Sequence, residues 1–233
     1  MSSKVENDRP RNALVIGASR GIGRAVLRRL KTHNWDTNGP PRSILDLSVA
    51  PTVDSFCNTL VNAVDAVIFS AGHNQLKNLA DVTPADLETS FNIHVLGPFR
   101  IIQHLVSNEL LNRGSSIVFL SSLYSEYGRA GRLVYSTTKH ATNGLVKNLA
   151  VELGHLGVKV NCVVPGFVDT ELTRKNLAAY EIRALQDRIP LGRIADIDEV
   201  ARFVLDLCEK NTYMNGQPLI LDGGLMAGGF WND

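Results

Sequence analysis

The sequence has few of the features that mark secreted, membrane-bound or metal-binding proteins. Its three cysteines, Cys57, Cys162 and Cys208, are an odd number at wide spacing, which predicts free thiols in a reducing compartment. Their spacing fits no zinc motif, so we expect no metal site. No apolar run approaches the roughly 20 residues that span a bilayer, and the polar first residues do not resemble a secretory signal. We therefore expect a cytoplasmic protein with no membrane partner.

The chain also lacks an excess of either charge. Lysine and arginine total 24 and aspartate and glutamate total 23, so the net charge is +1, which gives no argument for a nucleic-acid partner. Internal repeats and low-complexity tracts are missing as well. A length of 233 residues fits one α/β domain. We expect a loose tail over residues 1–11 and a single domain over 12–233.

Short apolar runs that end in small residues alternate along the chain with stretches of helical spacing. Strands are predicted over 12–16, 64–70, 116–120, 158–164 and 218–221. Helices are predicted over 22–30, 92–111, 135–153 and 197–207, with a polar helical excursion over 170–189. This alternation predicts a doubly wound parallel sheet of the Rossmann type in three layers. Ligands of such sheets bind beyond the carboxyl ends of the strands.

The segment 33–46 is short for the strand, helix and strand that this fold places there. The run Asn38-Gly39-Pro40-Pro41 excludes a continuous element. We expect a very short second strand, a possible strand over 43–47, and a helix that is missing or reduced to a turn.

Three glycines, Gly17, Gly21 and Gly23, lie between the first predicted strand and helix. Glycine lets the backbone approach a ligand closely. The N–H groups and the dipole at the start of a helix both favour an anion. The loop therefore predicts a pyrophosphate site.

Tyr135 and Lys139 are four residues apart on a predicted helix and so face the same way. An ammonium close to a phenol favours the phenolate and lowers its pKa from about 10. This pair predicts a tyrosine that can donate or accept a proton near neutral pH.

Taken together, these motifs resemble the short-chain dehydrogenase/reductase family in its compact single-domain form, from about residue 12 to residue 224. The family's Asn-Ala-Gly turn is matched by Ser70-Ala71-Gly72, and Ser122 lies 13 residues before Tyr135, the family's usual spacing for the catalytic serine. Pro165-Gly166 followed by Thr170 matches the loop beside the nicotinamide. The segments 189–193 and 222–224 are also typical of the family.

The resemblance implies a dinucleotide cofactor. The positions that it assigns to the cofactor are Gly17, Ser19, Arg20, Gly21, Ile22, Gly23, Arg42, Asp46, Ser70, Ala71, Gly72, Tyr135, Lys139, Pro165, Gly166, Val168 and Thr170. A basic residue at Arg20 suggests a 2′-phosphate and hence NADP(H), and Arg42 is a second candidate contact. Asp36 is the only local acid for the ribose diol of NAD, and it comes too early. Dihydropteridine reductases have a similarly short segment, so the truncation is compatible with cofactor binding.

The same resemblance implies the catalytic roles. Tyr135 is the general acid in reduction and the base in oxidation, Lys139 lowers its pKa and binds the nicotinamide ribose, and Ser122 polarises the substrate carbonyl. Thr170 touches the carboxamide or serves only as a helix N-cap. His94 stands where the family has an asparagine that helps hold a proton-relay water. Histidine can hydrogen-bond and titrate near neutrality, so we expect His94 to take over that role. The alternative is that His94 only caps a polar hole. Asn92 lies two residues away, about 200° round the helix.

We therefore expect an NADPH-dependent ketone reductase that acts on a small molecule. One alternative is an NAD-dependent alcohol or dihydrodiol dehydrogenase, and another is a catalytically idle binding module. The positions expected at the substrate pocket are Tyr124, Tyr127, Arg129, Arg174, Lys175 and Tyr180. The family commonly pairs its two long helices, which predicts a homodimer or homotetramer.

Overall fold

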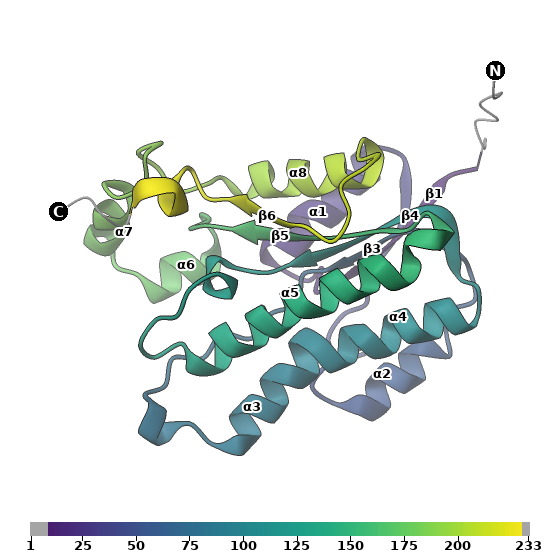
Figure 1. Ribbon diagram of the computed structural model, residues 1–233, viewed down its shortest axis with the longest axis horizontal. Helices are drawn as coiled ribbons and strands as arrows, with labels where there is room; N and C mark the ends of the chain where they lie inside the picture. Colours follow the sequence, from purple (N-terminus) through teal and green to yellow (C-terminus); the bar gives the residue numbers. More distant parts are fainter. Residues whose placement is uncertain (1–8, 230–233) are drawn as a thin grey trace.

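A six-stranded parallel sheet forms the centre of the protein, in the order β2-β1-β3-β4-β5-β6 (Figure 1). The computed structural model describes residues 9–229, apart from the side chains of Leu172 and Asn176. The strands are β1 (Arg11–Ile16), β2 (Trp35–Asn38), β3 (Val64–Phe69), β4 (Leu111–Leu120), β5 (Lys159–Pro165) and β6 (Pro218–Leu221). The predicted doubly wound α/β fold is confirmed.

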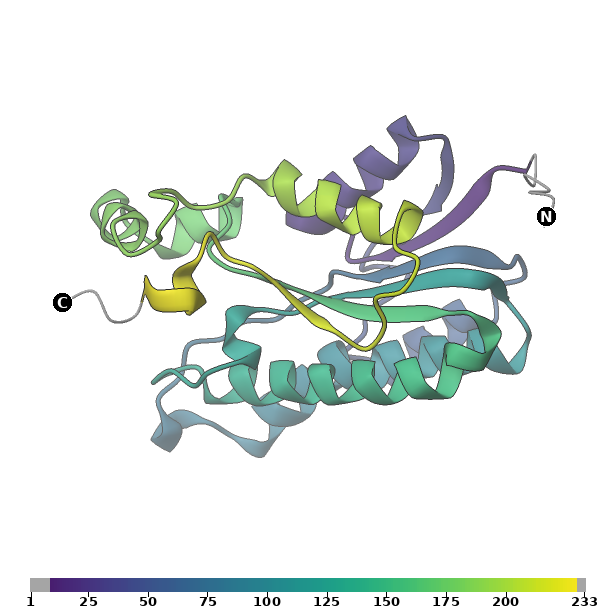
Figure 2. The ribbon, with the colours of Figure 1, turned by 45° about the horizontal axis from the view of Figure 1, so that its top comes forward.

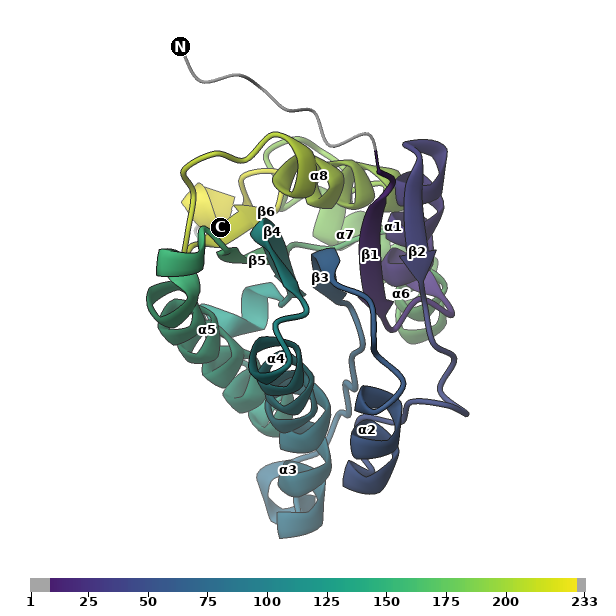
Figure 3. The same ribbon diagram turned by 90° about the vertical axis from the view of Figure 1, so that its right-hand side faces the viewer.

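Helices cover both faces of the sheet and give three layers (Figures 2 and 3). One face carries α1 (Gly21–Thr32) and α8 (Ile197–Glu209), and the other carries α2 (Ala50–Cys57), α4 (Gly97–Ser107) and α5 (Leu133–Leu153). The helices α6 (Glu171–Asn176) and α7 (Ala179–Gln186) lie beyond the carboxyl ends of the strands. Short helical segments cover Leu79–Asp81, Leu123–Ser125, Gly154–Leu156 and Leu225–Gly229.

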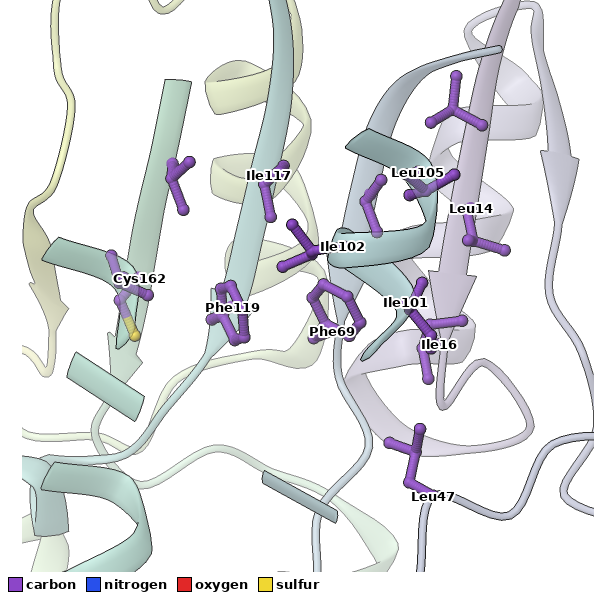
Figure 4. Packing of buried hydrophobic residues seen from close by; sticks show 14 of the residues in the cluster. Leu14, Ile16, Leu47, Phe69, Ile101, Ile102, Leu105, Ile117, Phe119 and Cys162 are labelled. Carbon is purple, nitrogen blue, oxygen red and sulfur yellow. The ribbon is translucent and has the colours of Figure 1, made fainter. Parts of the chain in front are cut away.

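Alternate residues of each central strand pack into two separate hydrophobic cores, one on each face of the sheet, because neighbouring strand side chains point to opposite faces. Leu14 and Ile16 of β1 pack toward α4, in the cluster of Figure 4, and Ala13 and Val15 pack toward α1 and α8. The rings of Phe69 and Phe119 stack there with centroids 4.8 Å apart. Burial on both faces explains why these strands read as continuous apolar runs.

The chain reverses its direction across the sheet between β1 and β3, because β2 lies on one side of β1 and β3 on the other. The loops that follow β1 and β3 meet at this point. The Ser70 N–H donates to the Ile16 carbonyl at 2.8 Å, and a Cβ on Gly17 would lie 2.4 Å from the Ala71 nitrogen. In open α/β sheets this switch point is where ligands bind.

The region after α1 differs in part from the prediction. The second strand, Trp35–Asn38, is very short, as predicted, whereas residues 43–47 form a loop with turns and not a strand, and α2 is a helix of eight residues rather than a turn. Leu45 and Leu47 are both 5% exposed, and their alternation mimics a strand although they pack as loop residues. Pro40 and Pro41 end the strand because proline has no N–H to donate to a ladder.

The long helix predicted over 92–111 begins earlier and ends earlier. The helical run starts with α3 (Pro84–Phe91), capped by Thr83 and Asp86, and a π-helix over Asn92–Leu96 joins it to α4. It ends at Ser107, because Glu109 has a φ of 55° and β4 begins at Leu111. The predicted polar excursion consists of two helices, α6 and α7.

The predicted tail over 1–11 lies outside the described residues up to position 8. Arg9 forms an ion pair with Asp65 at 2.7 Å, and Arg11, the first residue of β1, pairs with Glu209 at 2.7 Å. Among the helices of residues 9–229, none is long and apolar enough to cross a membrane.

Candidate active site

Tyr135 and Lys139 lie in the first turns of α5, which packs against the carboxyl end of the sheet. The Lys139 side chain is 3% exposed. Its Nζ donates to the carbonyl of Leu120, the last residue of β4, at 2.8 Å and lies 5.6 Å from the centre of the Tyr135 ring. The predicted pair is therefore assembled, and a backbone carbonyl fixes its ammonium.

Ser122 follows β4 directly and reaches the same place. Its side chain lies close enough to Tyr135 to act on the pKa of that phenol, and its hydroxyl accepts from the Tyr124 N–H at 3.4 Å as the cap of a short helix. The structure thus brings Ser122, which follows β4, together with Tyr135 and Lys139 of α5.

The pKa values of this pair do not follow the sequence prediction. Burial raises the pKa of Tyr135 above its ordinary value of 10, and the nearby Ser122 side chain opposes this only in part. Burial lowers the pKa of Lys139 to about 8. The expected depression of the Tyr135 pKa by Lys139 is wrong for this structure, because burial penalises the phenolate more strongly. A protonated Tyr135 is suited to donating a proton.

His94 is 3% exposed and ties the loop after β3 to α5. Its Nε2 accepts from the His73 N–H at 3.1 Å, and its Nδ1 lies 2.9 Å from the Thr138 hydroxyl. Since Nε2 accepts, the ring is neutral with its proton on Nδ1, which donates to Thr138. Thr138 in turn donates to the Tyr135 carbonyl at 3.0 Å.

Burial, with smaller contributions from Lys139 and His73, holds the pKa of His94 well below its ordinary value of 6.5. The expectation that this ring titrates near neutrality is therefore wrong. The ring forms a hydrogen-bonding bridge between the His73 N–H and the Thr138 hydroxyl, and its part in a proton relay stays a prediction. Asn92 starts the π-helix.

A small cavity of about 10 Å³ lies beside Lys139. His94, Pro98 and Thr142 line it together with Lys139, Leu120 and five apolar residues. The Thr142 hydroxyl is 3.4 Å from the His94 carbonyl. This volume is that of about one water site with several polar partners.

The glycine loop meets the steric demands of a nucleotide site. Gly17 has a φ of 89° and touches Ala71, and a Cβ on Gly23 would lie 2.3 Å from the Gly17 carbonyl oxygen. Gly21 has a φ of 56°, and a Cβ on it would have no atom of the described residues within 4 Å. Close packing explains why positions 17 and 23 are glycine, whereas Gly21 faces open space.

The first turn of α1 suits an anion. Arg20 is its N-cap residue, and no side chain of the described residues caps its N–H groups. The turn contains no acidic residue, and the preceding Ser19 and Arg20 are both exposed, with Ile22 half-buried. The orphan N–H groups and the helix dipole fit a phosphate.

The adenosine side contains one ion pair. Arg42 donates to Asp46 at 2.8 Å, and Asp46 accepts from the Ser48 hydroxyl at 2.6 Å. Burial opposes ionisation of Asp46, but these hydrogen bonds outweigh it and lower the pKa of the carboxyl. The end of β2 is Asn38 and is neutral, and Asp36 sits two residues earlier. Leu47 lines the small cavity beside Ala71, which brings this loop close to the Ser70–Gly72 turn.

The loop after β5 is fixed by main-chain contacts. The Gly166 N–H donates to the Leu221 carbonyl at 2.9 Å, and Val168 bridges to Ala195 and is buried. Pro165 ends β5, and Thr170 caps α6 by accepting from the Thr173 N–H at 3.1 Å. Of the two roles considered for Thr170, the structure contains the N-cap.

The residues expected around the substrate divide into two groups. The Tyr124 ring lies 6.0 Å from the Tyr135 ring and 5.3 Å from Tyr127, and Arg129 donates to the Tyr124 hydroxyl at 2.9 Å. In contrast, Arg174 pairs with Asp169 at 2.6 Å and Tyr180 is 71% exposed. Lys175 is exposed on α6 beside Arg174.

The sequence reasoning missed several groups at this site. Thr138 lies three residues after Tyr135, so helical spacing could have found it. The Leu120 carbonyl that accepts from Lys139 belongs to the backbone, so the residue types of the sequence give no indication of it. Asn74 and Arg132 come from separate loops and meet only in three dimensions.

Comparison with known proteins agrees with this geometry. Residues 45–226 match the family described as Enoyl-(Acyl carrier protein) reductase. The chain is 31% identical over 238 residues to "Uncharacterized oxidoreductase YmfI" of Bacillus subtilis, covering 92% of this chain and 98% of that protein. It is 32% identical over 237 residues to mouse (Mus musculus) "L-xylulose reductase", covering 93% and 97%.

Solved structures give the same result. A short chain dehydrogenase family protein of Francisella tularensis superposes with a TM-score of 0.84 at 25% identity, covering 94% of this chain and all of that one. A blue fluorescent protein from a metagenomic library, solved with NADPH, has a TM-score of 0.84 at 27% identity and covers 92% and 97%. The predicted family is thereby confirmed: the chain belongs to the short-chain dehydrogenase/reductase family of NAD(P)-dependent oxidoreductases.

Proposed function

We propose that this protein is an NADPH-dependent carbonyl reductase that converts a ketone into a secondary alcohol. The observation that carries the proposal is the convergence of Tyr135 with the Ser122 side chain and with the buried Lys139 ammonium, whose Nζ lies 5.6 Å from the centre of the Tyr135 ring. Burial raises the pKa of Tyr135, so near neutral pH the phenol holds a proton that it can give to a substrate oxygen.

The first turn of α1 would hold the pyrophosphate through its free N–H groups, and Gly21 leaves room for it. Arg20 is exposed at this turn and would contact the 2′-phosphate, which distinguishes NADPH from NADH. Arg42 has further donors beyond the one given to Asp46 and would add a second contact. The metagenomic relative was solved with NADPH, which supports this choice. When bound, the cofactor supplies a hydride to the carbonyl carbon.

Tyr135 donates its proton to the substrate oxygen as charge develops there, and Ser122 donates a hydrogen bond to the same oxygen. The Lys139 ammonium then stabilises the phenolate left on Tyr135. The small cavity bounded by Lys139, His94 and Thr142 has room for about one water, which would connect Lys139 to a source of replacement protons.

Two relatives carry names that support reduction of a carbonyl. One is the mouse L-xylulose reductase, and another is "3-oxoacyl-[acyl-carrier-protein] reductase FabG" of Aquifex aeolicus, 30% identical over 241 residues with 91% of this chain covered. Neither name gives the substrate of this chain. We further expect a cytoplasmic homodimer or homotetramer paired through α4 and α5. The mass of the protein in solution tests the assembly.

The alternative function, an NAD-dependent alcohol or dihydrodiol dehydrogenase, would use the same residues with Tyr135 as base. The raised pKa of Tyr135 disfavours that direction near neutral pH. An idle binding module would not need Ser122, Tyr135 and Lys139 to converge.

The testing experiment is a titration with NADPH and with NADH, followed by thermal shift, on the wild type and on Arg20→Ala. We expect tighter binding of NADPH, and loss of that preference in Arg20→Ala. Arg113→Ala is the matched control, since Arg113 is exposed at the start of β4, at the opposite edge of the sheet. Equal or stronger NADH binding would favour the dehydrogenase, and binding of neither would favour the idle module.

A further inference from the structure

We infer that Arg132 binds an anionic group of the substrate, so that the proposed reductase acts on carbonyl compounds bearing a carboxylate or a phosphate monoester. This inference rests on the proposed function and specifies the substrate class of the same site. Arg132 is the N-cap residue of α5, three residues before Tyr135.

The Arg132 guanidinium is held in place on two sides. Its Nη1 donates a hydrogen bond to Oδ1 of Asn74, which comes from the loop after Gly72. Its Cζ lies 5.4 Å from the centre of the Tyr124 ring, and that ring lies 6.0 Å from Tyr135. An arginine that is stacked on an aromatic ring and anchored at one end loses little entropy when it binds a ligand. Arg132 is therefore organised beside the reacting hydroxyl.

Within residues 9–229, no hydrogen bond uses the remaining donors of Arg132. Its Nε is buried and has no hydrogen-bond partner among the described residues. A guanidinium carries five N–H donors, and only the bond to Asn74 uses one of them. Buried donors without a partner are uncommon and call for a specific explanation. Because Nε is buried, a bound carboxylate or phosphate would accept from the N–H groups on the two Nη atoms.

Carboxylates pair with several other arginines of the chain but not with those at this site. Seven arginines, Arg9, Arg11, Arg24, Arg42, Arg100, Arg174 and Arg193, each form an ion pair with aspartate or glutamate. Within residues 9–229, neither Arg129 nor Arg132 has a carboxylate partner. Arg129 and Arg132, which both contact Tyr124 near Tyr135, thus carry two positive charges that no carboxylate of the described residues neutralises.

The acid in the same loop is directed elsewhere. Glu126 accepts from the Ser125 hydroxyl at 3.0 Å and from the Asn143 side chain at 2.8 Å, on the α5 side of the loop. With Lys139 also buried without a carboxylate partner among the described residues, the site has a positive potential. Such a potential concentrates and orients anionic substrates. Arg129 contributes charge but is exposed and donates to the Tyr124 hydroxyl, so we assign the direct contact to Arg132.

The test compares matched pairs of carbonyl compounds that differ in charge: 3-oxobutanoate and 4-oxopentanoate against their methyl esters, and dihydroxyacetone phosphate against dihydroxyacetone. We expect kcat/KM with NADPH to favour the anion in at least one pair. A charge-assisted bidentate contact corresponds to about 10- to 100-fold in that ratio. The oxo acids identify a carboxylate site, and the phosphate pair identifies a phosphate site.

The variants Arg132→Gln and Arg132→Lys separate this contact from a general effect of charge. In Arg132→Gln the ratio of anion to neutral partner should fall by about the same 10- to 100-fold, and Arg132→Lys should retain part of it because it keeps the charge but not the planar fork. Arg113→Gln should leave the ratio unchanged. Binding of NADPH and the melting temperature show whether each variant is folded.

If neutral partners are reduced as well as the anions, and Arg132→Gln leaves the ratio unchanged, the anion site is overturned while the reductase stands. If no carbonyl is reduced, the proposed function fails, and the anion site is then judged by ligand-observed NMR with 4-oxopentanoate. Binding by the wild type that Arg132→Gln abolishes supports the site. Equal binding by both proteins, or binding by neither, overturns it.

Discussion

Pro98 lies four residues after His94 and has no N–H with which to close the α-helical hydrogen bond to the His94 carbonyl. The helix adapts with a π-segment over Asn92–Leu96, directly before α4. Both residues line the small cavity beside Lys139. One proline thus shapes the wall of the cavity that we propose for the proton-relay water, and π-segments of this kind are frequent at functional sites.

Replacing Pro98 with alanine should slow turnover without weakening the fold. The new N–H can bond to the His94 carbonyl, straighten the π-segment and alter the cavity. We expect kcat to fall by about 10-fold, a part of the full contribution of proton transfer, with NADPH binding unchanged. Pro84→Ala is the control, since Pro84 opens α3 at a position where the N–H has no helical partner. A Pro98→Ala enzyme with wild-type kcat would contradict this role.

His94 should make the stability of the protein depend on pH in the acid range. The pKa of His94 in the folded state is held well below 6.5, mainly by burial. Below pH 6.5, His94 therefore binds a proton in the unfolded chain but stays neutral in the folded chain. Stability therefore falls as the pH decreases, by up to about 1.4 kcal/mol per pH unit. Urea unfolding of the wild type and of His94→Asn at pH 7, 6 and 5 measures this. The two proteins should differ in slope, and parallel pH profiles would show that His94 is not responsible.

Tyr135→Phe should remove the proton donor while keeping the ring and its packing. We expect kcat to fall by about 10²- to 10⁴-fold, with NADPH affinity close to that of the wild type. Tyr213→Phe is the matched control, because Tyr213 is 95% exposed. Stopped-flow oxidation of NADPH and equilibrium titration separate the two effects. Normal turnover in Tyr135→Phe would exclude Tyr135 as the acid.

Two glycines of the nucleotide loop should respond differently to alanine. In Gly17→Ala the new Cβ would meet the Ala71 nitrogen at 2.4 Å, so we expect a loss of stability of about 3 kcal/mol from overpacking and backbone strain. In Gly21→Ala the Cβ enters open space at a φ of 56°, so the fold should lose only about 1 kcal/mol while NADPH binding weakens strongly.

Gly114→Ala provides the control for this pair. Gly114 also has a positive φ, 83°, with open space around it, but it lies near the start of β4, far from the nucleotide loop. It should show the same backbone strain as Gly21→Ala and normal NADPH binding. Denaturant unfolding and NADPH titration of the three variants check the prediction, and equal loss of NADPH affinity in Gly114→Ala and Gly21→Ala would contradict it.

Periodicity along the chain was sufficient to predict the fold. Buried parallel strands such as β1 and β5 need apolar side chains on both faces, so they read as uninterrupted runs bounded by glycine or proline. The predicted strand over 43–47 was wrong, because alternate buried residues do not require a strand: Leu45 and Leu47 are buried but lie in a loop. It also missed α3, because the capping box at Thr83 and Asp86, a signal present in the sequence, was not used.

The sequence by itself determined the chemical groups of this protein: a glycine loop, a serine, a tyrosine and a lysine in the order and spacing of one family. The tertiary structure decided how those groups behave. Burial reverses the expected direction of the Tyr135 pKa and keeps His94 neutral, because desolvation depends on everything packed around a side chain and not on its neighbours in the chain. The meeting of Arg132 with Asn74 and Tyr124 likewise depends on loops that only the folded chain brings together.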